Sequence, residues 1–224
     1  MTASDTGLDK HDWQLLSVLT LNPDATPGEV RMRADMLPPS TWGSNLRGML
    51  TNAAWRKLSR ETSEAAGRRC VICGSESFGP NHTPQNPDCH EMWVFEVVDG
   101  VLVQRLERLV ALCKACHNVQ HAGRAEKLGL TGDVVDTLCR VNRWVPAEAE
   151  DDIDRAWDRY ELMSGLEFDL DLRALVGRIQ VGDGVDLYFQ ADEREKLGNS
   201  WLKGPNGPIA PTLFDLPTEG EERR

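Results

Sequence analysis

Residues 88–121 read DCHEMWVFEVVDGVLVQRLERLVALCKACHNVQH, and this stretch decides the fold. Its first half predicts a β-hairpin, because runs rich in β-branched residues at 93–98 and 101–106 flank Asp99-Gly100, a preferred pair for two-residue hairpin turns. Its second half predicts one helix over 115–128 that ends near Gly129. The order of hairpin and helix, with Cys and His residues at their junctions, predicts a small ββα unit.

The cysteines predict a structural metal site. Four of the six form two Cys-x-x-Cys pairs, Cys70/Cys73 and Cys113/Cys116. Two such pairs in a chain expected in a reducing cytosol are typical of a tetrahedral Cys₄ site, so we expect a structural Zn²⁺. The alternatives are two unrelated pairs, or attachment of a c-type haem through Cys113-x-x-Cys116-His117. Haem attachment would require export, which the N-terminal residues do not support, and would leave Cys70 and Cys73 without a role.

Three of the five histidines lie around the predicted hairpin. His117 and His121 are four residues apart on the predicted helix, so they share one face and can converge on one ion. His90 lies just before the first β-branched run. Each of these histidines alone could be structural, His117 as a zinc ligand or cap and His121 as a solvated helix residue. Together they predict a second metal site.

With these motifs the sequence resembles the HNH nuclease family. The resemblance rests on Asp88–Trp93 and on Leu112–Gly123, and it covers residues 55–129. It is most specific to a bacterial and phage subgroup that has Cys-His-Glu-x-Trp in place of the usual His-His. In that subgroup a preceding helix ends in Ala-Gly-x-x-Cys-x-x-Cys-Gly, which stands here at Ala66–Gly74.

The resemblance implies hydrolysis of a DNA phosphodiester to a 5′-phosphate and a 3′-hydroxyl. His90 would be the general base that deprotonates a water. His117 and His121 would hold a catalytic divalent cation, Mg²⁺, Mn²⁺ or Zn²⁺, that stabilises charge at the scissile phosphate. Asp88 or Cys89 would complete its ligand set from the strand.

Two positions depart from the family pattern. The Asn that members usually carry before the second cysteine pair is absent, and Arg108 is the nearest polar candidate to orient the catalytic His90. A metal-ligating His or Asp usually stands where this chain has Cys89. Either Cys89 is a soft ligand that favours zinc, or Asp88 reaches the ion, or Glu91 takes part.

Charge is distributed unevenly along the chain, whose net charge is −11. Residues 1–40 carry 3 basic and 6 acidic residues, residues 41–127 carry 11 and 9, and residues 128–224 carry 11 and 21. The middle is therefore weakly basic, and local charge decides whether a surface can bind phosphate. The candidate DNA-contacting residues are Arg56, Lys57, Arg60, Arg68, Arg69 and Arg124, together with Arg47. The alternative for those on the helix predicted over 52–66 is a solvated face.

We therefore expect an α+β protein with a small zinc-stapled ββα-metal core, a β-hairpin plus a helix, flanked by several helices. The expected regions are an N-terminal, partly mobile helical extension at 1–40, an HNH-like domain at 41–130, an acidic helical region at 131–200 and a flexible tail at 201–224. Further helices are expected at 26–36, 133–141 and 147–163. No apolar run is long enough for a membrane span, and residues 1–10 lack the basic and apolar regions of a signal peptide, so we expect a cytoplasmic protein.

The sequence favours a metal-dependent DNA endonuclease. A catalytically inactive HNH-like zinc module that binds nucleic acid or a protein partner is the alternative. A third hypothesis is an interaction protein whose acidic C-terminal third docks a basic partner, or folds over the cleft and repels DNA.

Overall fold

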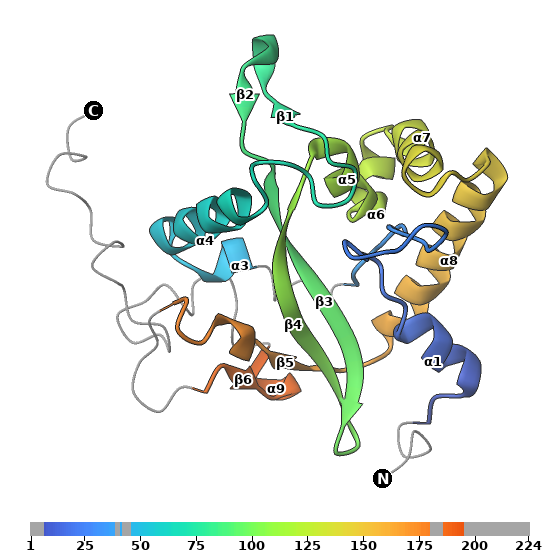
Figure 1. The fold of residues 1–224 in the computed structure, drawn as a ribbon. Helices are drawn as coiled ribbons and strands as arrows, with labels where there is room; N and C mark the ends of the chain where they lie inside the picture. The colour runs from blue at the N-terminus through green and yellow to red at the C-terminus, as the bar shows by residue number, and fades with distance from the viewer. Residues whose placement is uncertain (1–6, 39–40, 42–45, 180–185, 195–224) are drawn as a thin grey trace, which may run out of the picture.

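A long antiparallel hairpin forms the centre of the molecule (Figure 1). The computed structural model describes residues 7–38, 41, 46–179 and 186–194. The hairpin joins β3 (Asp88–Val98) to β4 (Val101–Leu112) through Asp99 and Gly100, whose φ angles of 52° and 86° are those of the predicted tight turn. The predicted hairpin is confirmed, and the fold is α+β as expected.

Two short strands extend the sheet beyond the hairpin. β5 (Asp169–Asp171) pairs parallel with β4, and β6 (Tyr188–Phe189) pairs antiparallel with β5. The sequence predicted only helices between 131 and 200, since strands of three and two residues are too short to show alternation. This region therefore joins the central sheet rather than only packing on it.

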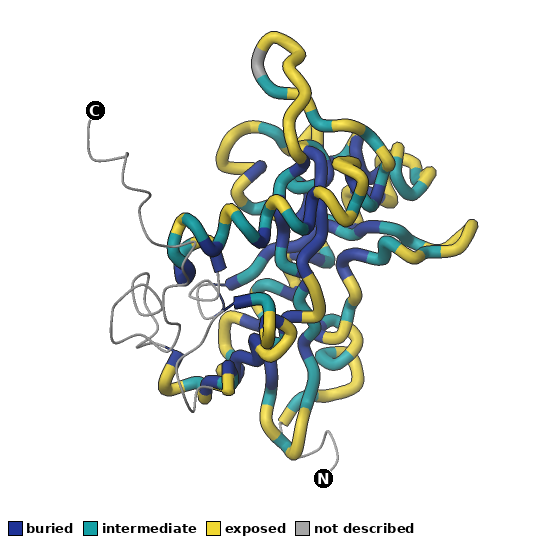
Figure 2. The backbone as a smooth tube through the Cα atoms, turned by 60° about the vertical axis from the view of Figure 1, so that its left-hand side comes forward, coloured by how far each residue is buried: buried dark blue, intermediate teal, exposed yellow. Residues whose placement is uncertain are grey.

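The hairpin is covered on both faces because side chains alternate along its strands. Cys89 packs with Leu58 of α4 (Asn52–Ala65), and the short α3 (Leu46–Met49) lies in the same cluster. Met92 packs on the other face with Val119 of α5 (Lys114–Val119) and with α6 (Ala122–Lys127). Figure 2 shows the buried central part of the hairpin, in contrast to the exposed loop above it.

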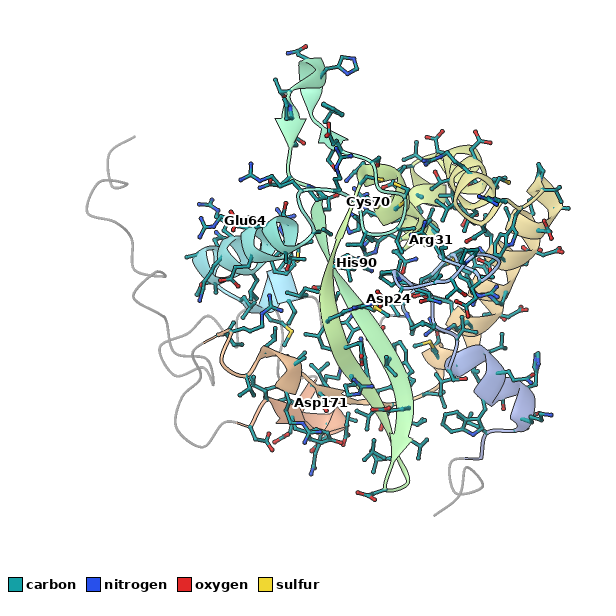
Figure 3. The ribbon with its side chains drawn as sticks, viewed as in Figure 1. Asp24, Arg31, Glu64, Cys70, His90 and Asp171 are labelled. Carbon is teal, nitrogen blue, oxygen red and sulfur yellow. The ribbon has the colours of Figure 1, made fainter. Side chains whose placement is uncertain are left out.

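That exposed loop is formed by a second, two-stranded sheet. It consists of β1 (Ser77–Phe78) and β2 (Pro84–Gln85), joined by the 3₁₀ helix η2 (Pro80–His82). Its strands pair antiparallel, with Ser77 opposite Gln85. The loop leaves the molecule next to Cys70 (Figure 3).

Helices from both ends of the chain complete the fold. They are α1 (Lys10–Leu16), α7 (Thr131–Asn142), α8 (Pro146–Ser164), the 3₁₀ helix η3 (Arg173–Leu175) and α9 (Ala191–Arg194). The predicted helices at 133–141 and 147–163 are therefore confirmed. Pro146 occupies the first helical position of α8, and the Glu148 carboxylate accepts a hydrogen bond from the N–H of Val145. No helix of the described residues is long and apolar enough to cross a membrane.

The prediction of a helix over 26–36 was wrong. The N–H of Thr26 does donate to the Glu29 carboxylate at 2.7 Å, but this contact closes only a turn. The chain then runs extended because distant side chains bind its backbone. Asn142 Oδ1 accepts from the N–H groups of Arg31 and Met32, at 3.0 and 3.2 Å. Tertiary hydrogen bonds thus prevail over the local capping signal. The predicted tail at 201–224 lies outside the described residues.

Candidate metal centres

Four cysteines meet at the end of the hairpin where β3 begins. The Sγ atoms of Cys70, Cys73, Cys113 and Cys116 all lie within 4.8 Å of one another, and those of Cys73 and Cys113 are 3.6 Å apart. Sulfurs bound tetrahedrally at about 2.3 Å from zinc would lie about 3.8 Å apart. None of the six cysteines forms a disulfide. These four, the Cys₄ cluster, fit a metal ion such as zinc, as the sequence predicted.

Local backbone geometry shapes the first cysteine pair. Gly74 has a φ of 73°, and its N–H donates to the carbonyl of Cys70 at 2.8 Å. The N–H of Val71 donates to the carbonyl of Ala111 at 3.0 Å, which ties this turn to β4. Arg69 donates to the carbonyl of Gly74 at 3.1 Å, so this residue, a predicted phosphate contact, also supports the cysteine turn.

Three histidines meet next to the Cys₄ cluster. His90 of β3, His117 of α5 and His121 each place a ring nitrogen within 4.8 Å of the others. We call them the histidine cluster. The Nε2 atoms of His117 and His121 are 3.1 Å apart, and nitrogens bound to one ion at 2.0–2.1 Å would lie about 2.9–3.4 Å apart. The His90 ring centroid lies 5.2 and 5.1 Å from those of His117 and His121. Figure 3 labels His90 and Cys70 at the same end of the hairpin.

His117 and His121 do not share one helix, contrary to the prediction. Helix α5 ends at Val119 and α6 begins at Ala122, so His121 lies at the break. Asp35 fills this break, because its N–H donates to the carbonyl of Val119 and its carbonyl accepts from the N–H of Ala122, both at 3.1 Å. Backbone groups that a helix break leaves unpaired thus find partners in a distant segment.

This segment, residues 31–36, is here called the N-terminal strap, and α8 holds it in place. Arg159 of α8 forms a buried ion pair with Asp35, and the two residues are 1% and 6% exposed. Asp152, also buried, accepts from the N–H of Ala34 at 2.7 Å. The roles of these residues could not be predicted, since nothing in the local sequence pattern pairs residue 35 with residue 159.

Asp88 lies behind His117 and not among the converging nitrogens. Nδ1 of His117 donates to the Asp88 carboxylate at 2.8 Å, and this hydrogen bond holds the pKa of Asp88 below its ordinary value. Metal-binding histidines typically donate their outer nitrogen to a carboxylate in this way, which fixes the ring orientation. The predicted ligand Asp88 is thus a partner of His117. Lys114, which the sequence analysis missed, lies 3.7 Å from the same carboxylate.

Cys89 lies on the opposite face of β3 from His90, because successive side chains of a strand alternate. It is 9% exposed and packs with the α4 cluster, and burial raises the pKa of its thiol to about 11. Glu91, on the same face, accepts from the N–H of Leu46 at 3.0 Å. The structure therefore does not bring Cys89 or Glu91 to the histidines. The expectation that Cys89 ligates the second ion is corrected.

His90 has no polar side chain to orient it within the described residues. It is 6% exposed, its Nδ1 atom has no hydrogen-bond partner, and Val110 lies opposite it in β4. Burial, with the two neighbouring histidines, holds the pKa of His90 well below its ordinary value. Arg108 lies opposite Met92 and forms an ion pair with Asp24 at 2.8 Å. The prediction that Arg108 orients His90 was therefore wrong.

The predicted DNA-contacting residues do not form one surface. Arg56, Lys57 and Arg60 belong to α4, which covers the face of the hairpin opposite to the histidine cluster (Figure 1). Arg68 is exposed just after α4, and Arg47 lies on α3.

On the histidine side, two exposed cations flank the cluster. Arg124 lies on α6, three residues after His121, and Lys114 lies at the start of α5. Both raise the positive potential near His121, as their charges act on this ring. The Asp88 carboxylate offsets part of this charge, because it lies 3.7 Å from the ammonium group of Lys114.

Comparisons of this chain with protein-family models, with curated proteins and with solved structures found no match.

Proposed function

We propose that this chain is a metal-dependent endonuclease of the HNH type that hydrolyses DNA phosphodiester bonds. The observation that carries the proposal is the meeting of His90, from the strand, with His117 of α5 and with His121 at the break between α5 and α6. This ββα arrangement lies directly beside a Cys₄ cluster. The same layout underlies the resemblance of the sequence to HNH nucleases.

The donor atoms fit two different ions. The Cys₄ cluster would hold a structural Zn²⁺, since four thiolates leave no open position for a substrate. His117 and His121 would hold a second divalent cation, because two nitrogens leave positions open. When bound, this cation supplies positive charge that stabilises the phosphate as its bond breaks.

The other residues of the site have roles that follow from their contacts. His90, with an unpartnered Nδ1, would accept the proton of the attacking water or serve as a third ligand. Asp88 would hold the ring of His117 in position. Lys114 and Arg124 would bind phosphates of the DNA on either side of the cluster.

Cleavage of supercoiled plasmid tests the proposal. The purified chain is incubated with Mg²⁺, Mn²⁺, Ni²⁺, Zn²⁺ or EDTA, beside His90→Ala, His121→Ala and His82→Ala. His82 is the matched control because it is an exposed histidine of η2, outside the cluster. We expect nicking that needs the metal, that falls at least 100-fold in the two cluster variants and that persists in His82→Ala. Equal nicking by all four proteins, or none by any, would contradict the proposal.

The role of His90 is tested by measuring the divalent affinity of His90→Ala by calorimetry. If His90 is the base, cleavage is lost while the affinity stays within about twofold of the unchanged chain, whereas loss of a ligand weakens it by at least 10-fold. His82→Ala again serves as the control.

A second candidate is a zinc module without catalytic activity that binds nucleic acid or a protein. The observation that favours it is the burial of His90, which limits the access of water and phosphate, together with the missing polar partner of its Nδ1. This candidate predicts that the chain binds DNA or a protein without cleaving DNA. The binding should be unaffected by His90→Ala and should be lost when the metal is removed from the Cys₄ cluster.

A further inference from the structure

Helices α6, α7 and α8 enclose a groove that the proposed nuclease does not use. Its volume is about 600 Å³, which lies within the range of roughly 300–1,000 Å³ typical of ligand pockets. The floor is apolar and is built by Met36, Ala122, Val134 and Ile153. Trp157 of α8 completes it on one side (Figure 1 shows the three helices). The groove could therefore hold a few apolar side chains.

Trp157 offers an anchoring surface in this groove. It is 36% exposed. Its ring packs edge-on against Tyr160 with centroids 5.5 Å apart, which restricts its motion. Tryptophan is enriched among the residues that dominate binding energy at protein interfaces, so its exposure beside an apolar floor is informative.

The charged residues at the rim of the groove are all acidic. Four exposed carboxylates line it, those of Glu126, Asp136, Glu150 and Asp154. None of them forms an ion pair with another described residue, and no Lys or Arg is among the described residues that line the groove. Such a rim repels nucleic acid and favours a cationic partner.

We propose that this groove is a docking site for a cationic segment of a partner protein, with Lys or Arg residues flanking one or two large apolar side chains. The apolar side chains occupy the floor beside Trp157, and the cations pair with the four carboxylates. The proposal goes beyond the nuclease activity and does not depend on it. The bound segment would contact α6 at Ala122, the residue that follows His121 of the histidine cluster.

Selection from a phage-displayed library of random 12-residue peptides against the full chain tests the proposal. We expect the enriched peptides to combine at least two Lys or Arg residues with an aromatic or long aliphatic residue. Their affinity, measured by fluorescence anisotropy, should fall at least 10-fold in Trp157→Ala and in the double variant Glu150→Lys/Asp154→Lys. It should also weaken as the salt concentration rises.

The matched control is Asp158→Lys, which makes the same kind of charge change on an exposed position of α8 that does not line the groove. It should keep the affinity within about twofold. The proposal is overturned if no peptide is enriched, if the enriched peptides lack basic residues, or if Asp158→Lys weakens binding as much as the groove variants do. It is also overturned if light scattering gives a dimer that Trp157→Ala converts to a monomer, since the groove would then bind a second copy of this chain.

Discussion

The two metal centres lie side by side, yet they are built in different ways. One half of the Cys₄ cluster is a tight turn at Cys70 and Cys73, the other is the start of α5 at Cys113 and Cys116, and the hairpin brings the two halves together. The histidine cluster takes one residue from a strand, one from α5 and one from the break between α5 and α6, and the N-terminal strap fixes this break. We infer that the first centre depends on local sequence and the second on contacts across the whole fold.

Removal of a cysteine should have the largest effect. In Cys116→Ser the chain should lose its zinc and its cooperative thermal unfolding, because binding of a structural zinc can contribute about 10–16 kcal/mol in small domains. Zinc content and circular dichroism measure both. Cys139→Ser is the control, since Cys139 packs beside the same core but outside the cluster. Retention of zinc by Cys116→Ser would contradict the assignment of the Cys₄ cluster.

Disruption of the strap should weaken metal binding at the histidine cluster and leave zinc binding at the Cys₄ cluster unchanged. Arg159→Met leaves Asp35 buried without its partner, so the free energy of unfolding should fall by about 3–5 kcal/mol. The folded protein should keep one zinc per chain but bind a second divalent ion at least 10-fold more weakly, because the position of His121 depends on Asp35. Calorimetry with Mn²⁺ after zinc loading measures this affinity.

Arg108→Met is the matched control for the strap. Arg108 pairs with Asp24 as Arg159 does with Asp35, but the two side chains are 45% and 80% exposed. Its loss should change stability by no more than about 1 kcal/mol and leave the second ion in place. An unchanged Mn²⁺ affinity in folded Arg159→Met would show that the strap does not position His121.

Asp88→Asn should have a smaller effect, confined to the histidine cluster. The amide replaces the charged acceptor of the His117 Nδ1–H by a neutral one, so divalent affinity should fall about 10–100-fold. Zinc in the Cys₄ cluster should be unaffected. The control is Asp99→Asn at the hairpin turn, where Asn is readily accepted. Equal divalent affinities in the two variants would show that Asp88 does not position His117 for metal binding.

Cys89→Ala should have the smallest effect on metal binding. The residue faces the α4 cluster, so the affinity for the second ion should stay within about twofold, while stability falls by about 1 kcal/mol through lost packing. Titration calorimetry and thermal unfolding give the two values. A large loss of affinity would show that Cys89 does reach the ion, as the sequence first suggested.

Local patterns predicted the parts of the fold that depend on local geometry. Asp99-Gly100 predicted the hairpin, and the cysteine spacing predicted the Cys₄ cluster. The three histidines of the second site were also identified, but not the way in which they meet. The helix break at His121 depends on Asp35, which is distant in sequence, and the orientation of His117 depends on Asp88. The spacing of residues on one element cannot show such contacts.

A β-bulge explains a further difference. The pairing register of the hairpin shifts between Met92 and Trp93. As a result, no residue of β3 lies opposite Glu107 in the register, and Arg108 lies opposite Met92. The sequence predicted the strands but not this extra residue, so the partner of His90 could not be derived from it. In the structure the residue of β4 that lies opposite His90 is the apolar Val110.

The most direct test of the account is the number of ions that the chain binds. Protein that already carries zinc is titrated with Co²⁺ by calorimetry, beside His121→Ala and the control His82→Ala. We predict one zinc that stays bound and one further Co²⁺ per chain, and we predict that only His121→Ala loses the Co²⁺. Absence of a second ion in the unchanged chain, or its full retention in His121→Ala, would contradict the existence of a second metal centre at the histidine cluster.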